Sequence, residues 1–184
     1  MRALILAPLA LVAACSQAPE AANSAAVNEA ATQAQPASGP VTTEEKSPST
    51  LYADATAAYN SFERAAGMIG KERGSSAAVR GYADMLYKEH GQFGMKLKLA
   101  SGKVPGLMPN PTLSPEQAAE LTALQQASGA AFDRLFMRRQ LAIHAAMLPV
   151  QQGYAAKGDE PALRDFADEY SRWVQRHLRM GKEV

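Results

Sequence analysis

The spacing of apolar residues from Leu51 onward constrains the fold more than any other feature of this sequence. Large apolar side chains recur every three or four positions, which is the period of an α-helix. No alternation of apolar and polar residues in this region is long enough to indicate a β-strand. Four long helices are predicted, at about residues 51–73, 77–101, 130–157 and 161–181. The chain from Leu51 is therefore expected to be all-α.

Residues that begin and end helices divide this region into two hairpins. Gly74 and Gly102 follow the first two helices, and the run Gly158-Asp159-Glu160-Pro161 combines a helix end with a helix start. Ser114-Pro115-Glu116-Gln117 has the residues of a capping box and predicts a short extra helix in the longer connection between the hairpins. This pattern is typical of an antiparallel four-helix bundle, the class that includes the ferritin-like folds.

The N-terminal residues 1–14 have the features of a secretory signal peptide. Arg2 supplies a positive start, and the apolar run after it is too short to span a bilayer as a helix. Leu11-Val12-Ala13-Ala14-Cys15 resembles the lipobox of bacterial lipoproteins, in which the cysteine is lipidated. Cys15 is the only cysteine of the chain, so it has no partner for an internal disulfide. We expect a membrane anchor at Cys15, with the protein on the outer membrane, facing the periplasm, or in the periplasm.

Residues 15–50 are expected to form a disordered tether between the anchor and a helical domain at 51–184. Between Ser16 and Thr50 the only large aliphatic side chains are Val27 and Val41, too few to bury a core. The whole chain has 19 basic and 18 acidic residues. Such a balance gives no surplus of positive charge for phosphate binding, so nucleic acid is not an expected partner.

One potential metal ligand lies on the apolar face of each long helix. These residues are Glu63, His90, His144 and His177, and they include every histidine of the chain. Counted along the helices from the turns, the two members of each hairpin are offset by roughly 7 Å at 1.5 Å per residue. Three imidazoles and a carboxylate would suit Zn, Fe, Mn or Cu, because a metal satisfies polar groups that are costly to bury alone.

A polar network without metal is the alternative explanation of the same four residues. Hydrogen-bond partners are available on the helices, namely Asp133, Asp84, Tyr82 and Tyr170. No Glu-x-x-His pair precedes a histidine, which argues against the carboxylate-bridged di-iron site of ferritins. Three methionines would suit copper(I) if they turned inward, but Met in a bundle is more often core filler; they are Met85, Met137 and Met147.

Several segments resemble the DUF4142 family, whose bacterial members have a ferritin-like helical domain. Residues 128–133, Ser-Gly-Ala-Ala-Phe-Asp, with Gln140 and His144 downstream, are similar to the family's Gly-x-x-Phe-Asp segment and its histidine. Residues 79–90, the run at 158–161 and His177-Leu178 continue the likeness, which extends from about Tyr52 to Leu178. The resemblance implies a ferritin-like fold and no settled biochemical activity.

Two residues depart from the family pattern near the predicted site. Glu89 stands where the family has Asp beside His90, and Pro149 is expected to kink the third long helix.

The leading interpretation is a non-enzymatic envelope lipoprotein whose bundle binds a metal through the four residues. A metal-free structural or interaction module and an oxidoreductase using iron or manganese are the alternatives.

Overall fold

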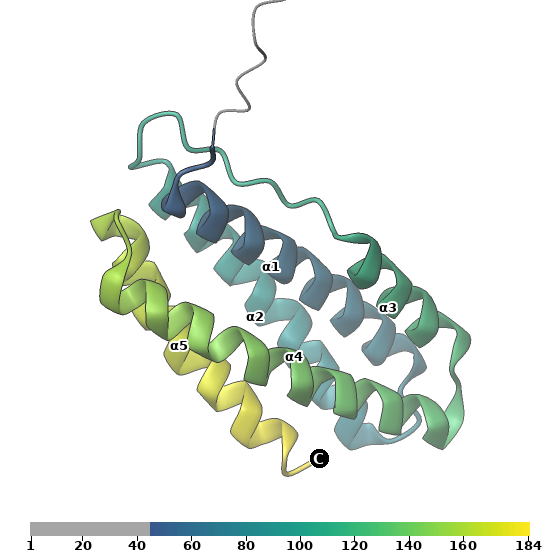
Figure 1. The fold of residues 1–184 in the computed structure, drawn as a ribbon. Coiled ribbons are helices and arrows are strands. Elements are labelled where there is room, and N and C mark those ends of the chain that lie inside the picture. Colours follow the sequence, from purple (N-terminus) through teal and green to yellow (C-terminus); the bar gives the residue numbers. More distant parts are fainter. Residues whose placement is uncertain (1–44) are drawn as a thin grey trace, which may run out of the picture. The chain divides into compact units, whose positions relative to one another are not determined.

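The computed structural model describes residues 45–184, and every regular element in that range is a helix (Figure 1). The elements are α1 (Pro48–Arg73), α2 (Ala77–Ser101), α3 (Pro115–Gln126), α4 (Gly129–Lys157) and α5 (Pro161–Gly181). The all-α prediction is therefore confirmed. The predicted signal peptide, Cys15 and the tether as far as residue 44 lie outside the described residues. None of the described helices is long and apolar enough to cross a membrane.

The helix ends follow the local sequence, with one difference at the start of α1. Gly74 and Gly102 cap the first two helices as predicted, and Ser114 forms the expected capping box with Gln117. Helix α1, however, begins three residues before the predicted Leu51. The Ser47 hydroxyl accepts a hydrogen bond from the backbone N–H of Thr50, and a proline occupies the first turn. Residues 48–50, which the sequence analysis places in the tether, therefore belong to the helix.

The four long helices pack as two hairpins in a helical bundle (Figure 1). Helix α1 packs along α2, and α4 packs along α5. The hairpins meet where α2 contacts α5 and α1 contacts α4, while α3 lies against α1 and α4. Gly67 allows the close approach of α1 to α2, because a Cβ atom there would lie 2.8 Å from the backbone nitrogen of Tyr87. Helix α4 continues through Pro149 to Lys157.

The interior consists of two apolar clusters with a polar layer between them. One cluster includes Tyr59, Phe93, Leu97, Phe166, Tyr170 and Val174. The other includes Phe62, Val79, Leu86, Leu124, Phe132 and Phe136. Along α1, α2 and α4 the change from one cluster to the other falls at buried polar residues, namely Asn60, Glu63, His90, Gln140 and His144. On α5 the apolar core residues all belong to the first cluster, and the buried His177 follows the last of them, Val174. Polar side chains buried between apolar clusters cost free energy unless they are hydrogen-bonded. The side chains of this polar layer therefore need partners or a ligand.

Candidate metal centre

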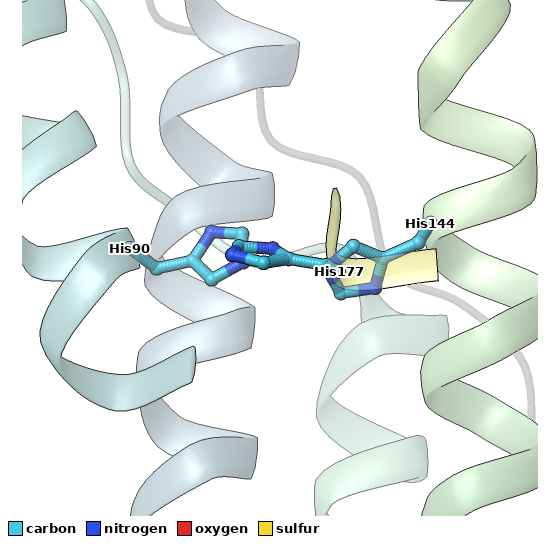
Figure 2. A group of neighbouring side chains, drawn as sticks. All are labelled: His90, His144 and His177. Carbon is cyan, nitrogen blue, oxygen red and sulfur yellow. The ribbon is translucent and has the colours of Figure 1, made fainter. Parts of the chain in front are cut away.

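Three histidines from three helices meet in the polar layer. His90 comes from α2, His144 from α4 and His177 from α5, and all three side chains are completely buried. One ring nitrogen from each lies within 4.8 Å of the other two. Figure 2 shows the three imidazoles turned toward one another across the interior of the bundle. The predicted convergence of the histidines is thus present in the structure.

The offset expected within the α4–α5 hairpin is absent at the level of the rings. Nε2 of His144 lies only 3.1 Å from Nδ1 of His177. Side chains in a helix lean toward its N-terminus. In this hairpin His144 leans away from the turn and His177 leans toward it, so the two leanings close the gap that was counted along the axes.

Glu63 is not a member of this group, although it is completely buried nearby. Neither carboxylate oxygen of Glu63 has a hydrogen-bond partner of ordinary geometry among the described residues. Burial raises the pKa of Glu63 to about 8, although the neighbouring Gln140 amide acts to lower it. Gln140 also accepts a hydrogen bond through its backbone oxygen from Nδ1 of His144 at 2.9 Å. Gln140 thus lies between the Glu63 carboxyl and His144. The raised pKa favours the protonated form of Glu63 at neutral pH.

The outer nitrogens of His144 and His177 both face hydrogen-bond acceptors. The backbone carbonyl of Gln140 can only accept, so Nδ1 of His144 must carry a proton. Nε2 of His177 lies 2.6 Å from the Glu89 carboxylate. Burial acts to raise the pKa of Glu89, but hydrogen bonds from His177 and Arg176 outweigh it and hold that pKa below its ordinary value. Glu89 is therefore ionised, and Nε2 of His177 donates to it.

His90 is held in the same way by a partner on each of two helices. Its Nδ1 atom lies 3.0 Å from the side-chain oxygen of Asn60 and 2.9 Å from the Tyr170 hydroxyl. The Asn60 amide nitrogen donates to the backbone oxygen of Thr56, which turns the amide oxygen toward His90. The Tyr170 hydroxyl donates its proton to the side-chain oxygen of Asn60 at 2.7 Å. The hydroxyl oxygen of Tyr170 can therefore accept a hydrogen bond from His90. Nδ1 of His90 is consequently the protonated nitrogen, and Nε2 has no hydrogen-bond partner among residues 45–184.

The protons thus assigned leave three lone pairs directed into the cluster. In neutral rings these belong to Nε2 of His90, Nε2 of His144 and Nδ1 of His177. Burial lowers the pKa of His144 to about 3, with a further lowering from His177, so this ring stays neutral. Burial and the two neighbouring histidines also hold the pKa of His90 well below its ordinary value. Two facing lone pairs at 3.1 Å repel each other unless a cation lies between them.

The histidines come together as the sequence predicts, but two of the four residues offered as their hydrogen-bond partners, Asp133 and Asp84, do not contact them. Glu89, which departs from the family pattern beside His90, contacts His177 on α5. Asp133 instead accepts hydrogen bonds from Ser75 and Ser76 before α2, and Asp84 forms ion pairs with Lys71 and Lys88 on the surface. Tyr170 does contact the cluster, as predicted, and Tyr82 donates to the backbone oxygen of His177.

Asn60 and Gln140 were missed as partners of the site. Each lies on the buried face of its helix, one turn from an apolar residue of the core, and each is almost completely buried. A buried amide on a helix seam is the signal that could have identified them, since such groups need partners. Two methionines considered for copper, Met85 and Met137, pack against an apolar cluster. The Met147 sulfur accepts a hydrogen bond from Gln151.

Comparison with known proteins gives one finding. The model of a family described as "Domain of unknown function (DUF4142)" matches residues 30–184, which is most of the chain. No curated protein and no solved structure matches the chain.

Proposed function

The chain belongs to the DUF4142 family, and from this premise we propose that its helical domain binds one transition-metal ion through His90, His144 and His177. The observation that carries the proposal is the set of three inward lone pairs, each fixed by an acceptor on the opposite side of its ring. Metal-binding histidines in proteins have this arrangement, in which the second nitrogen donates to a carboxylate, carbonyl or similar group.

The distances agree with a metal of the imidazole-preferring kind. Two nitrogens bound to one tetrahedral metal at 2.0–2.1 Å lie about 3.3 Å apart. The nitrogens of His144 and His177 are at 3.1 Å, and the third nitrogen of the group is within 4.8 Å of both. A small movement of the His90 ring would complete the set. Zn²⁺, copper and Fe²⁺ accept imidazole more readily than Mn²⁺ does, and we propose Zn²⁺ as the first ion to test.

Charge balance gives Glu63 a role beside the three histidines. A divalent cation and three neutral rings would bring two positive charges into the core, where Glu89 is already shared with Arg176. The buried Glu63 carboxyl is the next acidic group, and a nearby cation favours its ionised form. We propose that Glu63 loses its proton when metal binds and stabilises the bound ion, as a fourth ligand or through Gln140.

The rival is a metal-free network with a proton in place of the metal. A proton on Nδ1 of His177 would donate to Nε2 of His144, and Glu89 would neutralise the resulting imidazolium. This interpretation accounts for the 3.1 Å contact but leaves Nε2 of His90 without a partner. A buried polar atom left in that way costs about 1–3 kcal/mol. Metal binding satisfies all three nitrogens at once.

Metal content of the purified protein tests the proposal. The full chain would carry Cys15→Ser, so that its only cysteine binds no metal, and no histidine tag. After exposure to Zn²⁺, Fe²⁺, Mn²⁺ and Cu²⁺ in turn, we expect about one ion per chain by mass spectrometry. His90→Phe, which fills the space of the ring but removes its lone pair, should abolish stoichiometric binding.

A second variant separates loss of the site from loss of a buried polar group. Gln151 is buried in α4 and bonded to Tyr52, away from the histidines, so Gln151→Leu should leave metal binding intact. Circular dichroism would show that both variants remain helical. Absence of bound metal from the parent protein would contradict the proposal and favour the metal-free network.

We propose that the domain is held at the outer membrane through lipidated Cys15, with residues 15–47 as the tether. The support is the lipobox-like sequence at residues 11–15. Labelled palmitate should be incorporated by the parent chain and not by Cys15→Ser, with the label in the outer-membrane fraction. We also propose the ferritin-like arrangement for the bundle, in keeping with the two-hairpin packing. An iron- or manganese-dependent oxidoreductase remains a further hypothesis, which peroxide turnover by metal-loaded protein would test.

A further inference from the structure

We propose that a pocket between α1, α2 and the segment after α2 binds a linear aliphatic carboxylate. The pocket has a volume of about 480 Å³, within the range of small-molecule sites in proteins. Its walls are mainly apolar and come from Ala57, Leu97, Leu107, Met108, Pro109 and Pro111. The inference does not depend on metal binding, because the apolar wall and the cations of the pocket are not part of the proposed metal site, which the pocket meets only at His90 and Asn60.

The pocket owes its depth to glycines on the face of α2 that meets α1. Gly91 and Gly94 both line it, and a Cβ atom added to Gly94 would meet nothing within 4 Å. Two exposed methionines also line it, Met95 at 64% and Met108 at 86% exposure. Flexible methionine side chains adapt to apolar ligands of different shape. Such a lining fits an alkyl chain better than a rigid polar molecule.

The charges around the pocket are positive. Arg64 of α1 and Lys98 of α2 line it and are exposed, whereas no acidic residue is part of its wall. Neither cation forms an ion pair with any residue in the described range 45–184. An apolar wall with unpaired cations at its rim is complementary to an alkyl chain that ends in an anion.

Arg64 is the better placed of the two cations to bind a carboxylate. Its Nε atom would lie 3.5 Å from a Cβ atom on Gly91, so the guanidinium stands beside the glycine face of the pocket. The guanidinium also lies over the Tyr87 ring, which limits its freedom. A planar guanidinium binds a carboxylate through two parallel hydrogen bonds, which an ammonium group cannot do.

A buried polar atom without a partner lies where the pocket meets the last residue of α2. The Ser101 side chain is 1% exposed, lines the pocket, and its hydroxyl has no hydrogen-bond partner among the described residues. Asn60 and His90 are also in the wall, so the pocket reaches the polar layer of the bundle. A bound molecule would therefore lie along α2, from Gly91, which is next to both His90 and Arg64, toward Ser101 at the end of the helix.

The proposal is tested with octanoate, 1-octanol and acetate as probes of the chain and the charge. The full-length Cys15→Ser protein, free of metal, would be titrated with each and followed by NMR. Octanoate should bind more tightly than octanol, and acetate should not bind. Arg64→Gln should weaken octanoate about fivefold, the effect of one partly exposed charge-assisted contact, and leave octanol unchanged.

Filling the pocket gives an independent test. Gly94→Leu should abolish binding of both octanoate and octanol, because its side chain would occupy the open space. Gly81→Leu is the matched control, since Gly81 lies on the same helix, also has nothing within 4 Å of an added Cβ, and does not line the pocket. Equal affinity for octanoate and octanol, or octanoate binding that survives both Gly94→Leu and Arg64→Gln, would overturn the proposal.

Discussion

Nε2 of His144 and Nδ1 of His177 face each other at 3.1 Å, while the other nitrogen of each ring faces an acceptor. If both outer nitrogens carry protons and both rings are neutral, the two inner lone pairs repel each other, and either a metal ion between them or a proton on one of them removes the repulsion. In the proton alternative the charge lies close to the Glu89 carboxylate, which is 2.6 Å from Nε2 of His177. The two possibilities differ at His90, because its Nε2 atom has no hydrogen-bond partner among residues 45–184 and only the metal alternative uses that atom.

Replacing Glu89 by Gln should weaken metal binding. The ionised carboxylate fixes which nitrogen of His177 carries the proton and makes the other a better ligand. We expect zinc affinity to fall about 10- to 100-fold, the usual effect of losing such a partner, as measured by competition with a chromophoric chelator. Glu169→Gln, which removes an exposed partner of Lys96, should leave the affinity unchanged. Equal zinc affinity in Glu89→Gln and the parent would argue that Glu89 has only a structural role.

Acid should destabilise the metal-free domain through His144. Its pKa is lowered to about 3 in the folded state, against an ordinary value of 6.5, mainly by burial. The unfolded chain therefore binds a proton first, so this group stabilises the fold above pH 6.5 and its contribution is lost as pH falls toward 3. Urea unfolding at several pH values would give the free energy of unfolding as a function of pH. Between pH 6 and 4 its slope should correspond to about one proton fewer in His144→Asn than in the parent. Parallel slopes for the two proteins between pH 6 and 4 would contradict the prediction.

A rise in pH from 4.5 to 8 should destabilise the metal-free domain through Glu63. Burial raises the pKa of this carboxyl from 4.5 to about 8 in the folded state. Its contribution to the free energy of unfolding is thus fully present below pH 4.5 and is lost as pH rises to 8. Metal-free Glu63→Gln should gain a few kcal/mol over the parent across that range, since a pKa unit corresponds to about 1.4 kcal/mol. A stability difference between the two proteins that does not change with pH would show that Glu63 is not buried as described.

The helices were predictable because their ends are encoded locally. Serine caps, prolines in first turns and glycines after last turns act within a few residues, and the three long helices α2, α4 and α5 begin and end at the predicted residues or within one residue of them. Helix α1 differs because Ser47 and Pro48 form a start signal that lies before the first apolar residue, Leu51. An apolar pattern alone cannot locate a start that depends on capping.

The histidines were predictable as a group, but the partners that orient them were not. A spacing of three and four residues places a side chain on the interior, whereas pairing across helices depends on tilt and on the direction in which each side chain leans. Asn60, rather than Glu63, is level with His90 because it is one turn further from the Gly74 turn. Adjacent side chains of a helix point in different directions around its axis, so Glu89 contacts His177 on α5 and not the neighbouring His90.

The close packing of α1 on α2 should be required for the site itself. In Gly67→Ala the new Cβ atom would lie 2.8 Å from the backbone nitrogen of Tyr87 and 2.9 Å from the backbone oxygen of Ala83. Backbone atoms cannot turn aside, so the two helices must separate, at a cost of about 1–3 kcal/mol in the free energy of unfolding. Urea unfolding would measure this loss.

The same separation should also weaken metal binding. Asn60 of α1 holds His90 of α2 through a 3.0 Å contact, and moving the helices apart would release the ring from the orientation that presents its lone pair. Zinc affinity should therefore fall in Gly67→Ala although the substitution touches no histidine. Gly81→Ala on α2 has open space around its Cβ atom and should instead stabilise the helix by about 0.5–1 kcal/mol with unchanged zinc affinity. A Gly67→Ala protein that is as stable as the parent and binds zinc as tightly would mean that the helices do not approach as closely as described.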